Sequence, residues 1–311
     1  MKITALAGGV GGAKLIDGLA ACLSPEELTV IVNTGDDFDH LYLRICPDLD
    51  TICYTLAGIS NPETGWGLKN ESWNAMNSIM NLGGPDWFQL GDKDLGTHIE
   101  RTRRLHQGQS LSQVTNHFCT AWGVKNKVLP MSDEPVSTII RTREFGELSF
   151  QDYFVKNKCE PEIIKIRFEG IHQALPAPGV INAIDNADVI VICPSNPWVS
   201  VDPILSIHGI LPKIIQKPSI AISPIIQGKT IKGPAAKMFL ELGIEPSALA
   251  VASHYKETIK AIVIDRLDAD LECEIANIGI IPFITNTKMI SNDNRLQLAK
   301  DVLNFIVRII N

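Results

Sequence analysis

The stretch MKITALAGGVGGAKLIDGL, residues 1–19, decides how this chain begins to fold. KITALAG (2–8) is a short apolar run typical of a buried strand, and residues 13–23 have the apolar spacing of a helix. Four glycines, at positions 8, 9, 11 and 12, join the two segments. A buried strand, a glycine-rich turn and a helix in this order predict the first unit of an α/β sheet.

The same alternation returns later in the chain. Apolar, β-branched runs predict buried strands at 28–34, 187–194, 219–225 and 260–266, and a last strand at 272–280. Helical patterns occupy 202–215, 233–243 and 294–310. Strands that alternate with helices and are apolar along their length predict an α/β fold with a doubly wound, mostly parallel, Rossmann-like sheet covered on both faces.

The middle of the chain follows another pattern. Residues 48–124 carry helical patterns, turn clusters and four of the five tryptophans, and residues 136–172 indicate a β-containing excursion. We therefore expect residues 1–47 and 173–311 to form the sheet core. Residues 48–172 are expected to form an inserted, largely helical cap.

Composition narrows the class of protein. With 45% hydrophobic and 20% charged residues the chain can bury a core, and its formal net charge of −7 argues against a nucleic-acid partner. We find no signal-peptide pattern and no apolar window of about 18 residues, so we expect no membrane segment. The seven scattered cysteines lack CxxC spacing, which favours reduced thiols and a cytoplasmic location over disulfides or a zinc site.

The glycine-rich turn is the first candidate binding site, because ligands of open parallel sheets bind beyond the carboxyl ends of the strands. Gly9, Gly11 and Gly12 would let the backbone approach a phosphate, which the free N–H groups of the following helix would bind. Lys14 either reaches back to that phosphate or is solvated. The loop matches neither G-x-G-x-x-G nor a Walker A motif, so an ordinary tight turn is the alternative.

Five aspartates follow the second predicted strand. NTGDDFDH (33–40) contains Asp36, Asp37 and Asp39, and CPDLDT (46–51) adds Asp48 and Asp50 at a predicted helix start. An N-cap is the alternative role for Asp48 or Asp50. Carboxylates beside a phosphate loop, in a net-acidic protein, favour a Mg²⁺ ion that is shared with substrate phosphates.

Two further loops follow later predicted strands and are expected at the same edge of the sheet. PSNPWVSVDP (194–203) and SPIIQGKTIKGPA (223–235) offer groups for a phosphate, ribose or base, namely Ser195, Asn196, Pro197, Ser223, Gln227, and Lys229 or Lys232. Each loop alone is an ordinary turn. The sequence has no GxSxG, HExxH or CxxC motif, so nucleophilic and zinc hydrolysis are disfavoured.

Eight motifs occur in one order along the chain: GGVGGAKLIDGL, NTGDDFDH, CPDLDT, NPETGWGL, WFQLGDKDLGTHI, PMSDEPV, PSNPWVSVDPIL and SPIIQGKTIKGPA. Together they resemble the archaeal type of the 2-phospho-L-lactate transferase (CofD) family of coenzyme F-420 biosynthesis. The resemblance spans nearly the whole chain. It implies transfer of a phospholactyl group from lactyl-2-diphospho-5′-guanosine to the terminal ribityl hydroxyl of the deazaflavin FO, with release of GMP, use of Mg²⁺, and a homodimer.

The resemblance also implies roles for single residues. Asp50 matches the acid near the reactive hydroxyl of FO, so we expect it to be a metal ligand, a hydroxyl-orienting group or a general base. Asp37 is expected as a second metal ligand. FO contacts are expected from Gln89, where relatives often carry a basic residue, and from Trp66, Met131 and Ser132. Trp73 and Trp87 are further stacking candidates, with core packing as the alternative for each tryptophan.

The guanosine diphosphate part is expected to contact the glycine loop and the two later loops. Its predicted contacts are Gly9, Gly11, Gly12, Lys14, Asp36, Ser195, Asn196, Pro197, Ser223, Gln227 and Lys229.

Two other functions remain as alternatives. One is a non-enzymatic regulator of related fold that binds nucleotide-diphospho-sugars. The other is a nicotinamide-dependent oxidoreductase, which the imperfect glycine fingerprint and the surplus of acids disfavour. The choice between a lactyl and a phosphoenolpyruvyl donor also stays open, because the two groups differ little in shape.

Overall fold

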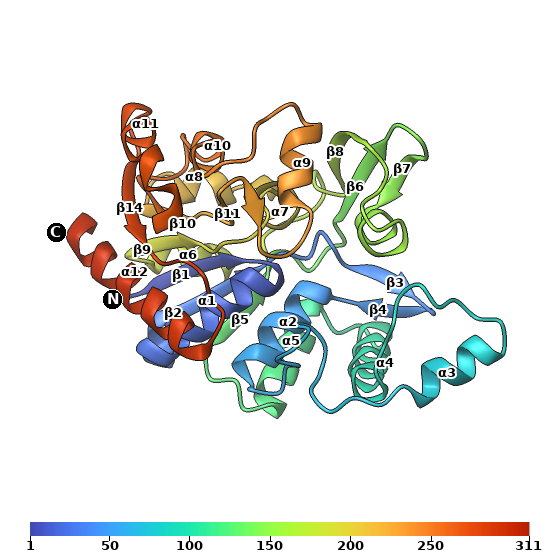
Figure 1. The fold of residues 1–311 in the computed structure, drawn as a ribbon. Coiled ribbons are helices and arrows are strands. Elements are labelled where there is room, and N and C mark those ends of the chain that lie inside the picture. The colour runs from blue at the N-terminus through green and yellow to red at the C-terminus, as the bar shows by residue number, and fades with distance from the viewer. Residues whose placement is uncertain (311) are drawn as a thin grey trace.

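A seven-stranded parallel sheet runs through the molecule in the computed structural model, which describes residues 1–310 (Figure 1). Its order is β14-β13-β10-β9-β1-β2-β5, and each neighbouring pair is parallel. The strands are β1 (Ile3–Ala7), β2 (Leu28–Val32), β5 (Lys127–Pro130), β9 (Val189–Ile192), β10 (Ser219–Ile222), β13 (Ala261–Asp265) and β14 (Ile281–Thr285). The predicted α/β fold with a doubly wound parallel sheet is confirmed.

The switch point of the sheet lies between β1 and β9. From β1 the chain moves outward through β2 to β5, and it then crosses back to β9 and moves outward in the other direction. Loops after β1 and β9 therefore leave their strands side by side and diverge to opposite faces. In an open α/β sheet this is where a ligand-binding crevice forms.

Alternating side chains of the strands bury two apolar layers. Ile3, Ala5 and Ala7 of β1 join one buried cluster, and Leu6 joins the other. Four helices cover the first face: α1 (Gly9–Cys22), α2 (Pro47–Leu56), α5 (Leu111–Ala121) and α12 (Asn292–Ile310). The second face is covered by α6 (Val180–Asn186), α7 (Asp202–Ser206), α8 (Ile210–Ile214), α9 (Ala235–Glu241), α10 (Ala248–His254) and α11 (Glu272–Asn277). The first and last helices, α1 and α12, lie side by side (Figure 1).

Two predicted elements were wrong. No strand forms over residues 272–280; residues 272–277 form α11 instead, although ECEI alternates polar and apolar residues as a strand does. Only Ile275 of α11 is buried, and the last strand is instead β14, which pairs with β13. The helix predicted over 202–215 is interrupted, because Gly209 has a φ of 86° and separates α7 from α8.

Smaller elements surround the sheet. They are the hairpins β3 (Phe38–His40) with β4 (Leu43–Ile45) and β11 (Ile225–Ile226) with β12 (Lys229–Thr230), and the helices α3 (Asn74–Asn81) and α4 (Asp92–His106). A second sheet has the order β7 (Gly146–Ser149), β6 (Ser137–Thr142) and β8 (Ile163–Glu169). Short helical turns are η1 (Pro25–Glu27), η2 (Asp152–Lys156), η3 (Pro197–Val201) and η4 (Arg266–Leu271).

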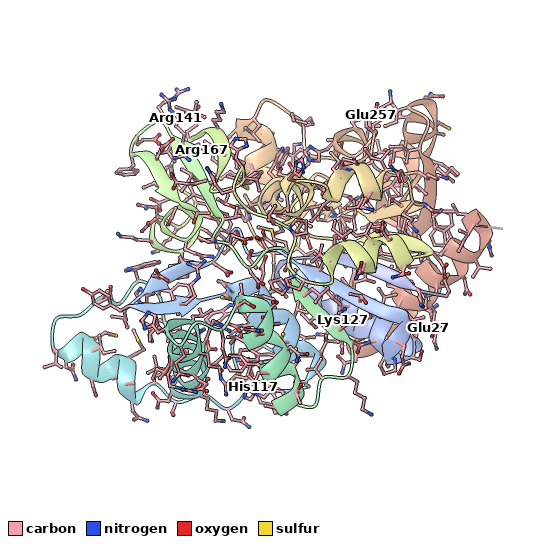
Figure 2. The ribbon with its side chains drawn as sticks, turned by 180° about the vertical axis from the view of Figure 1, so that it is seen from behind. Glu27, His117, Lys127, Arg141, Arg167 and Glu257 are labelled. Carbon is pink, nitrogen blue, oxygen red and sulfur yellow. The ribbon has the colours of Figure 1, made fainter. Side chains whose placement is uncertain are left out.

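The region expected as a cap is only partly separate from the main sheet. Its helices α3 and α4 and the sheet of β6 to β8 stand outside the main sheet, but β5 pairs with β2 inside it. The division at residues 47/48 and 172/173 stays a prediction. Seen from behind, Arg141 and Arg167 mark the second sheet and Lys127 marks β5 (Figure 2).

Across residues 1–310, none of the helices is both long enough and apolar enough to span a membrane.

Candidate active site

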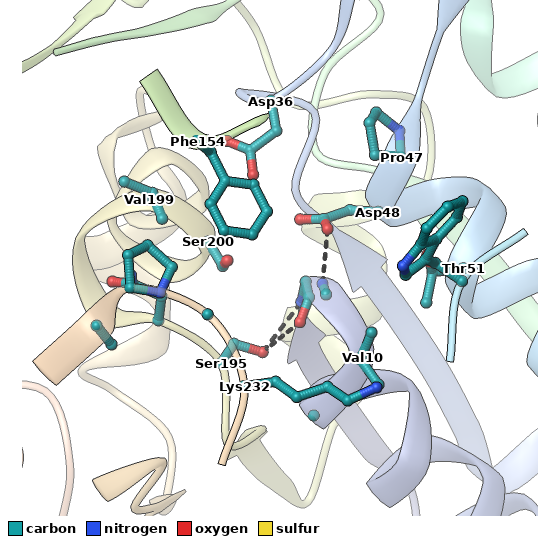
Figure 3. Close-up of a pocket in the computed structure, with 18 of the residues that line it drawn as sticks. Val10, Asp36, Pro47, Asp48, Thr51, Phe154, Ser195, Val199, Ser200 and Lys232 are labelled. Atoms are coloured by element: carbon teal, nitrogen blue, oxygen red, sulfur yellow. Dashed lines mark hydrogen bonds between the residues drawn. The ribbon is translucent and has the colours of Figure 1, made fainter. Parts of the chain in front are cut away.

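A cavity of about 630 Å³ opens at the carboxyl ends of β1 and β9, at the switch point of the sheet (Figure 3). Its walls come from the turn between β1 and α1, the start of α2, and the loops that follow β2, β9 and β10. Residues of the expected cap close the other side. The cavity therefore lies where the topology of the sheet places a ligand.

The glycines of the first turn let three segments meet at this point. Gly9 has a φ of 64°, and its N–H donates to Asp48 Oδ1 at 2.6 Å. A Cβ on Gly8 would press on the Asp48 carboxylate and lie 2.8 Å from Ser200 Cβ. The Gly8 amide donates to Ser195 Oγ at 3.1 Å, and the Ser195 hydroxyl donates to the Gly8 carbonyl at 2.8 Å (Figure 3). These bonds fix the loops after β1 and β9 against each other across the switch point.

Asp48 has a different role from the predicted N-cap. The N-cap of α2 is Cys46, and Asp48 instead accepts hydrogen bonds from the start of α1 and from Asn33 Nδ2 at 2.9 Å. Burial raises the pKa of Asp48 to about 6. Burial and the neighbouring Asp48 also raise the pKa of Asp36 well above its usual range. The Asp48 carboxylate thus lies at the N-terminus of α1, where a helix favours negative charge, and Asp36 is its neighbour.

The two carboxylate oxygens of Asp50 differ, because one is in an ion pair and the other has no hydrogen-bond partner. The Arg101 guanidinium of α4 forms a buried ion pair with Asp50 Oδ1. Asp50 Oδ2 is buried without a hydrogen-bond partner, and His98 Nδ1 lies 3.8 Å from it. Burial raises the pKa of Asp50, while Arg101 and His98 oppose that rise. One oxygen of this carboxylate therefore remains available to a ligand in the cavity.

His98 and Asp94, which sequence analysis did not single out, extend this network. His98 Nε2 lies 3.4 Å from Asp94 Oδ1, and the Tyr54 hydroxyl donates to the same oxygen at 2.7 Å. Both residues line the cavity and belong to one face of α4. The available signal was the spacing of Asp94, His98 and Arg101, which are three or four residues apart on a helix.

Aromatic side chains form a wall of the cavity. They are Trp66, Trp87, Phe88, Phe150 and Phe154. Trp87 packs edge-to-face on His40 of the hairpin, with ring centroids 5.1 Å apart. Trp66 keeps 47% of its surface exposed, and its backbone carbonyl and amide bond to the Thr64 hydroxyl. Trp73 lies at the N-cap of α3 and is not part of the lining.

Ten of the predicted site residues line the cavity together. They are Gly9, Gly11, Lys14, Asp36, Asp50, Trp66, Gln89, Ser195, Asn196 and Ser223. Several of them already have partners, since the Asn196 side chain accepts from the Trp198 amide and the Gln89 amide group donates to the Asp86 carbonyl. The structure therefore brings the predicted glycine, carboxylate and serine groups into one space.

Seven predicted residues lie elsewhere. Gly12, Met131, Ser132 and Pro197 are buried outside the lining, and Gln227 and Lys229 are exposed residues of the hairpin of β11 and β12. Asp37 lines a separate cavity of about 170 Å³ and faces Arg44 at 3.9 Å. The sequence could not show that Asp36 lines the main cavity and Asp37 the smaller one, because this depends on how the turn directs the two carboxylates.

Within residues 1–310 no group of three His, Cys, Asp or Glu side chains is arranged to hold a metal ion by itself. Asp36 Oδ1 and Asp50 Oδ2 are nevertheless buried in the lining without hydrogen-bond partners. This donor set fits Mg²⁺, which usually takes one or two carboxylates and completes its coordination with water and substrate phosphates.

A doubly wound sheet with a glycine turn, buried carboxylates and a cavity at its switch point is typical of the class of nucleotide-binding α/β enzymes. The comparisons identify the family within that class. The family model described as 2-phospho-L-lactate transferase CofD matches residues 3–288. The chain therefore belongs to the CofD family, and it is a transferase of coenzyme F-420 biosynthesis.

Similar proteins with two names support the family. The chain is 42% identical to the phosphoenolpyruvate transferase of Streptomyces griseus subsp. griseus, over 90% of each chain. It is 37% identical to the 2-phospho-L-lactate transferase of Methanocaldococcus jannaschii, over 97% of each chain. Among solved structures, protein BH3568 of Bacillus halodurans matches with a TM-score of 0.61 and 16% identity, over 97% of this chain and 99% of the other. At that identity the likeness shows the fold alone.

Proposed function

We propose that this protein transfers the 2-phospho-L-lactate group from lactyl-2-diphospho-5′-guanosine to the ribityl hydroxyl of FO (7,8-didemethyl-8-hydroxy-5-deazariboflavin), which gives coenzyme F-420-0 and GMP. The observation that carries the proposal is one cavity whose lining contains a glycine turn, an aromatic wall and the free oxygen of Asp50. Family membership supports the same reaction.

The donor is proposed to bind at the switch point. The N-terminus of α1 offers N–H groups of its first turn to a diphosphate, and Lys14 lies in the same lining. Ser195, Asn196 and Ser223 follow β9 and β10 in the lining, and we propose that they contact the guanosine. Three other residues of these loops are not part of the cavity lining, namely Pro197, Gln227 and Lys229. We propose that they stabilise the shape of the loops and do not contact the donor.

The acceptor is proposed to bind against the aromatic wall. Flat deazaflavin rings suit the faces of Trp66 and Trp87, and Gln89 offers an amide in the same wall. Met131 and Ser132 are fully buried, so contact with FO through these two residues stays a prediction that requires movement of the wall.

Asp50 is proposed to prepare the acceptor hydroxyl. Its Oδ2 accepts the hydroxyl proton as the hydroxyl oxygen forms a bond to the β-phosphorus of the donor, while the bond from that phosphorus to the GMP oxygen breaks. Arg101 keeps Asp50 Oδ1 occupied, which directs Oδ2 to the cavity. In this role Asp50 is the catalytic residue, and Arg101 is a positioning residue.

Mg²⁺ is proposed as the cofactor, with Asp36 as a carboxylate that would hold it beside the donor phosphates. Asp50 would be a metal ligand only in place of its role as proton acceptor, because both roles use Oδ2. When bound, the ion offsets negative charge on the transferring group. Asp37 as a second ligand stays a prediction, since its carboxylate faces Arg44 in the other cavity.

A phosphoenolpyruvyl donor is the second candidate, because similar proteins at 42–43% identity carry the name phosphoenolpyruvate transferase. A competition assay distinguishes the donors: FO is incubated with equal amounts of the lactyl and enolpyruvyl donors, and the products are separated by mass, since they differ by two hydrogen atoms. Excess lactyl product supports the first proposal, and excess enolpyruvyl product replaces it with the second. If neither product forms while GDP binds, the nucleotide-binding regulator becomes the better interpretation.

A homodimer and a cytoplasmic location are also proposals. The family resemblance supports the dimer, and sedimentation equilibrium tests it against the chain mass of 34.1 kDa. The cysteines, all of them unpaired in the structure, support a reducing compartment.

A further inference from the structure

Lys232 joins two loops over the mouth of the cavity. It lies in segment 231–234, between β12 and α9, and its Nζ donates to the Thr64 carbonyl at 2.7 Å. Thr64 belongs to segment 61–67, which carries Trp66 of the aromatic wall. The two bonded residues are 168 positions apart in the sequence, and Lys232 reaches toward Val10 at the start of α1 (Figure 3).

The start of α1 lies directly beneath this contact. A Cβ on Gly65 would lie 2.7 Å from Val10 Cγ1 and 3.5 Å from Lys232 Nζ. Gly65 has a φ of 77°, so this approach depends on a residue without a side chain. The loop of the aromatic wall, the loop after β12 and the proposed phosphate-binding turn therefore meet at one place.

Lys232 also supplies positive charge where the cavity is otherwise acidic. Four carboxylates line the cavity, those of Asp36, Asp48, Asp50 and Asp94. The described lining includes two lysines, Lys14 and Lys232, and neither forms an ion pair with a carboxylate in the described chain.

The two ammonium groups lie close enough to affect each other. Lys14 Nζ donates to the Met289 carbonyl at 2.9 Å. Burial lowers the pKa of Lys14, and Arg295 and Lys232 lower it further. The Lys14 and Lys232 ammonium groups thus repel each other near the N-terminus of α1, and each bonds only to a backbone carbonyl. An anion bound between the two groups would offset this repulsion.

We propose that Lys232 binds the diphosphate of the guanosine donor while it keeps the Thr64 carbonyl, so that the donor fastens segment 61–67 and Trp66 over the cavity. An ammonium group has three donors, and one is used by Thr64. The remaining donors can reach a phosphate oxygen in a charge-assisted hydrogen bond. Donor binding would then order the wall against which the acceptor binds. This inference rests on the proposed donor and concerns how that donor is held.

The test compares GDP binding by the wild type, Lys232→Met and Lys232→Arg without FO. The control is Lys69→Met, because exposed Lys69 makes the same kind of bond, from Nζ to the Gly58 carbonyl at 2.8 Å, outside the cavity. Calorimetry gives the Kd. The GDP-induced change in tryptophan fluorescence, measured with and without Trp66→Phe, reports on segment 61–67.

We expect Lys232→Met to weaken GDP binding about tenfold or more and to abolish the Trp66 signal at saturating GDP. Lys232→Arg is expected to keep most of the GDP affinity and most of the Trp66 signal. Lys69→Met is expected to match the wild type in both measurements. Unchanged GDP affinity in Lys232→Met, or a normal Trp66 signal in that variant, would overturn the proposal. Because no turnover is measured, a wild type that binds GDP but forms no product would contradict the proposed reaction and leave this test intact.

Discussion

At the scale of single residues, Asp50 shows how folding prepares a reactive group. Its carboxylate has one oxygen in a buried ion pair with Arg101 and the other without a partner in the cavity lining. A lone buried carboxylate would be protonated, because desolvation disfavours the charged form. Arg101 opposes that shift and so keeps the group available to accept a proton or hold a cation.

Asp50→Asn tests this role. The amide can neither accept the hydroxyl proton nor offer a negative oxygen, so we expect kcat to fall about 100-fold or more. GDP affinity measured in EDTA should stay close to that of the wild type, because Asp50 is not among the proposed direct contacts of the guanosine diphosphate. Initial rates and calorimetry measure the two effects. Turnover within a few-fold of the wild type would rule out a catalytic Asp50.

Asp37 gives a prediction about stability and pH. Burial raises its pKa to about 7, so the folded state holds a proton that the unfolded chain releases near pH 4. The stabilisation from this proton is fully present below the unfolded pKa and is lost as pH rises toward and through 7. Asp37→Asn removes the titration.

We therefore expect the stability of Asp37→Asn relative to the wild type to increase by about 2 kcal/mol between pH 5 and pH 8. Urea unfolding in EDTA at both pH values measures it, and Asp185→Asn, which removes an exposed carboxylate paired with Lys213, is the control. A pH-independent difference would show that Asp37 titrates at an ordinary pKa.

At the scale of elements, the approach of α1, α2 and the loop after β9 fixes the site. The approach depends on Gly8, whose amide and carbonyl both bond to Ser195. The Asp48 carboxylate and Ser200 occupy the space that a side chain would need. A methyl group there would push apart the segments that hold the donor site.

Gly8→Ala should lower the free energy of unfolding by about 1–3 kcal/mol and weaken GDP binding. The matched control is Gly96→Ala on α4, where a Cβ meets nothing within 4 Å. Because glycine is unfavourable inside a helix, Gly96→Ala should stabilise by about 0.5–1 kcal/mol. Equal effects of the two substitutions, measured by urea unfolding, would contradict the close approach at Gly8.

Features of the fold and the site that depend on neighbouring residues in the sequence could be predicted, and features that depend on distant residues could not. The strands of the main sheet were predictable because their apolar, β-branched runs are buried on both faces. The alternation of polar and apolar residues in 272–280 wrongly predicted a strand, because the segment forms a helix that buries Ile275 against the rest of the fold. The bond from Gly9 to Asp48 joins residues 39 apart, and the pairing of His98 with Asp50 joins α4 to α2, so neither follows from local pattern.

At the scale of the whole molecule, the cavity joins groups from every part of the chain. The first turn, the α4 network, segment 150–155 after β7 and the loop before α9 all contribute to its lining. A ligand that contacts these segments together should stabilise the native state by mass action.

GDP at about 100 times its Kd should therefore stabilise the fold by about 2.7 kcal/mol and raise Tm, while NADH should leave Tm unchanged. Differential scanning fluorimetry with each ligand makes the comparison. A shift with NADH and none with GDP would favour the oxidoreductase.

Direct turnover tests the central claim. Purified protein is mixed with FO, lactyl-2-diphospho-5′-guanosine and Mg²⁺, and a parallel reaction contains EDTA. Chromatography follows the deazaflavin product and GMP, and Asp50→Asn serves as the inactive control. We predict that both products form in equal amounts and only with the metal. Unchanged FO in the presence of Mg²⁺ and bound donor would contradict the account.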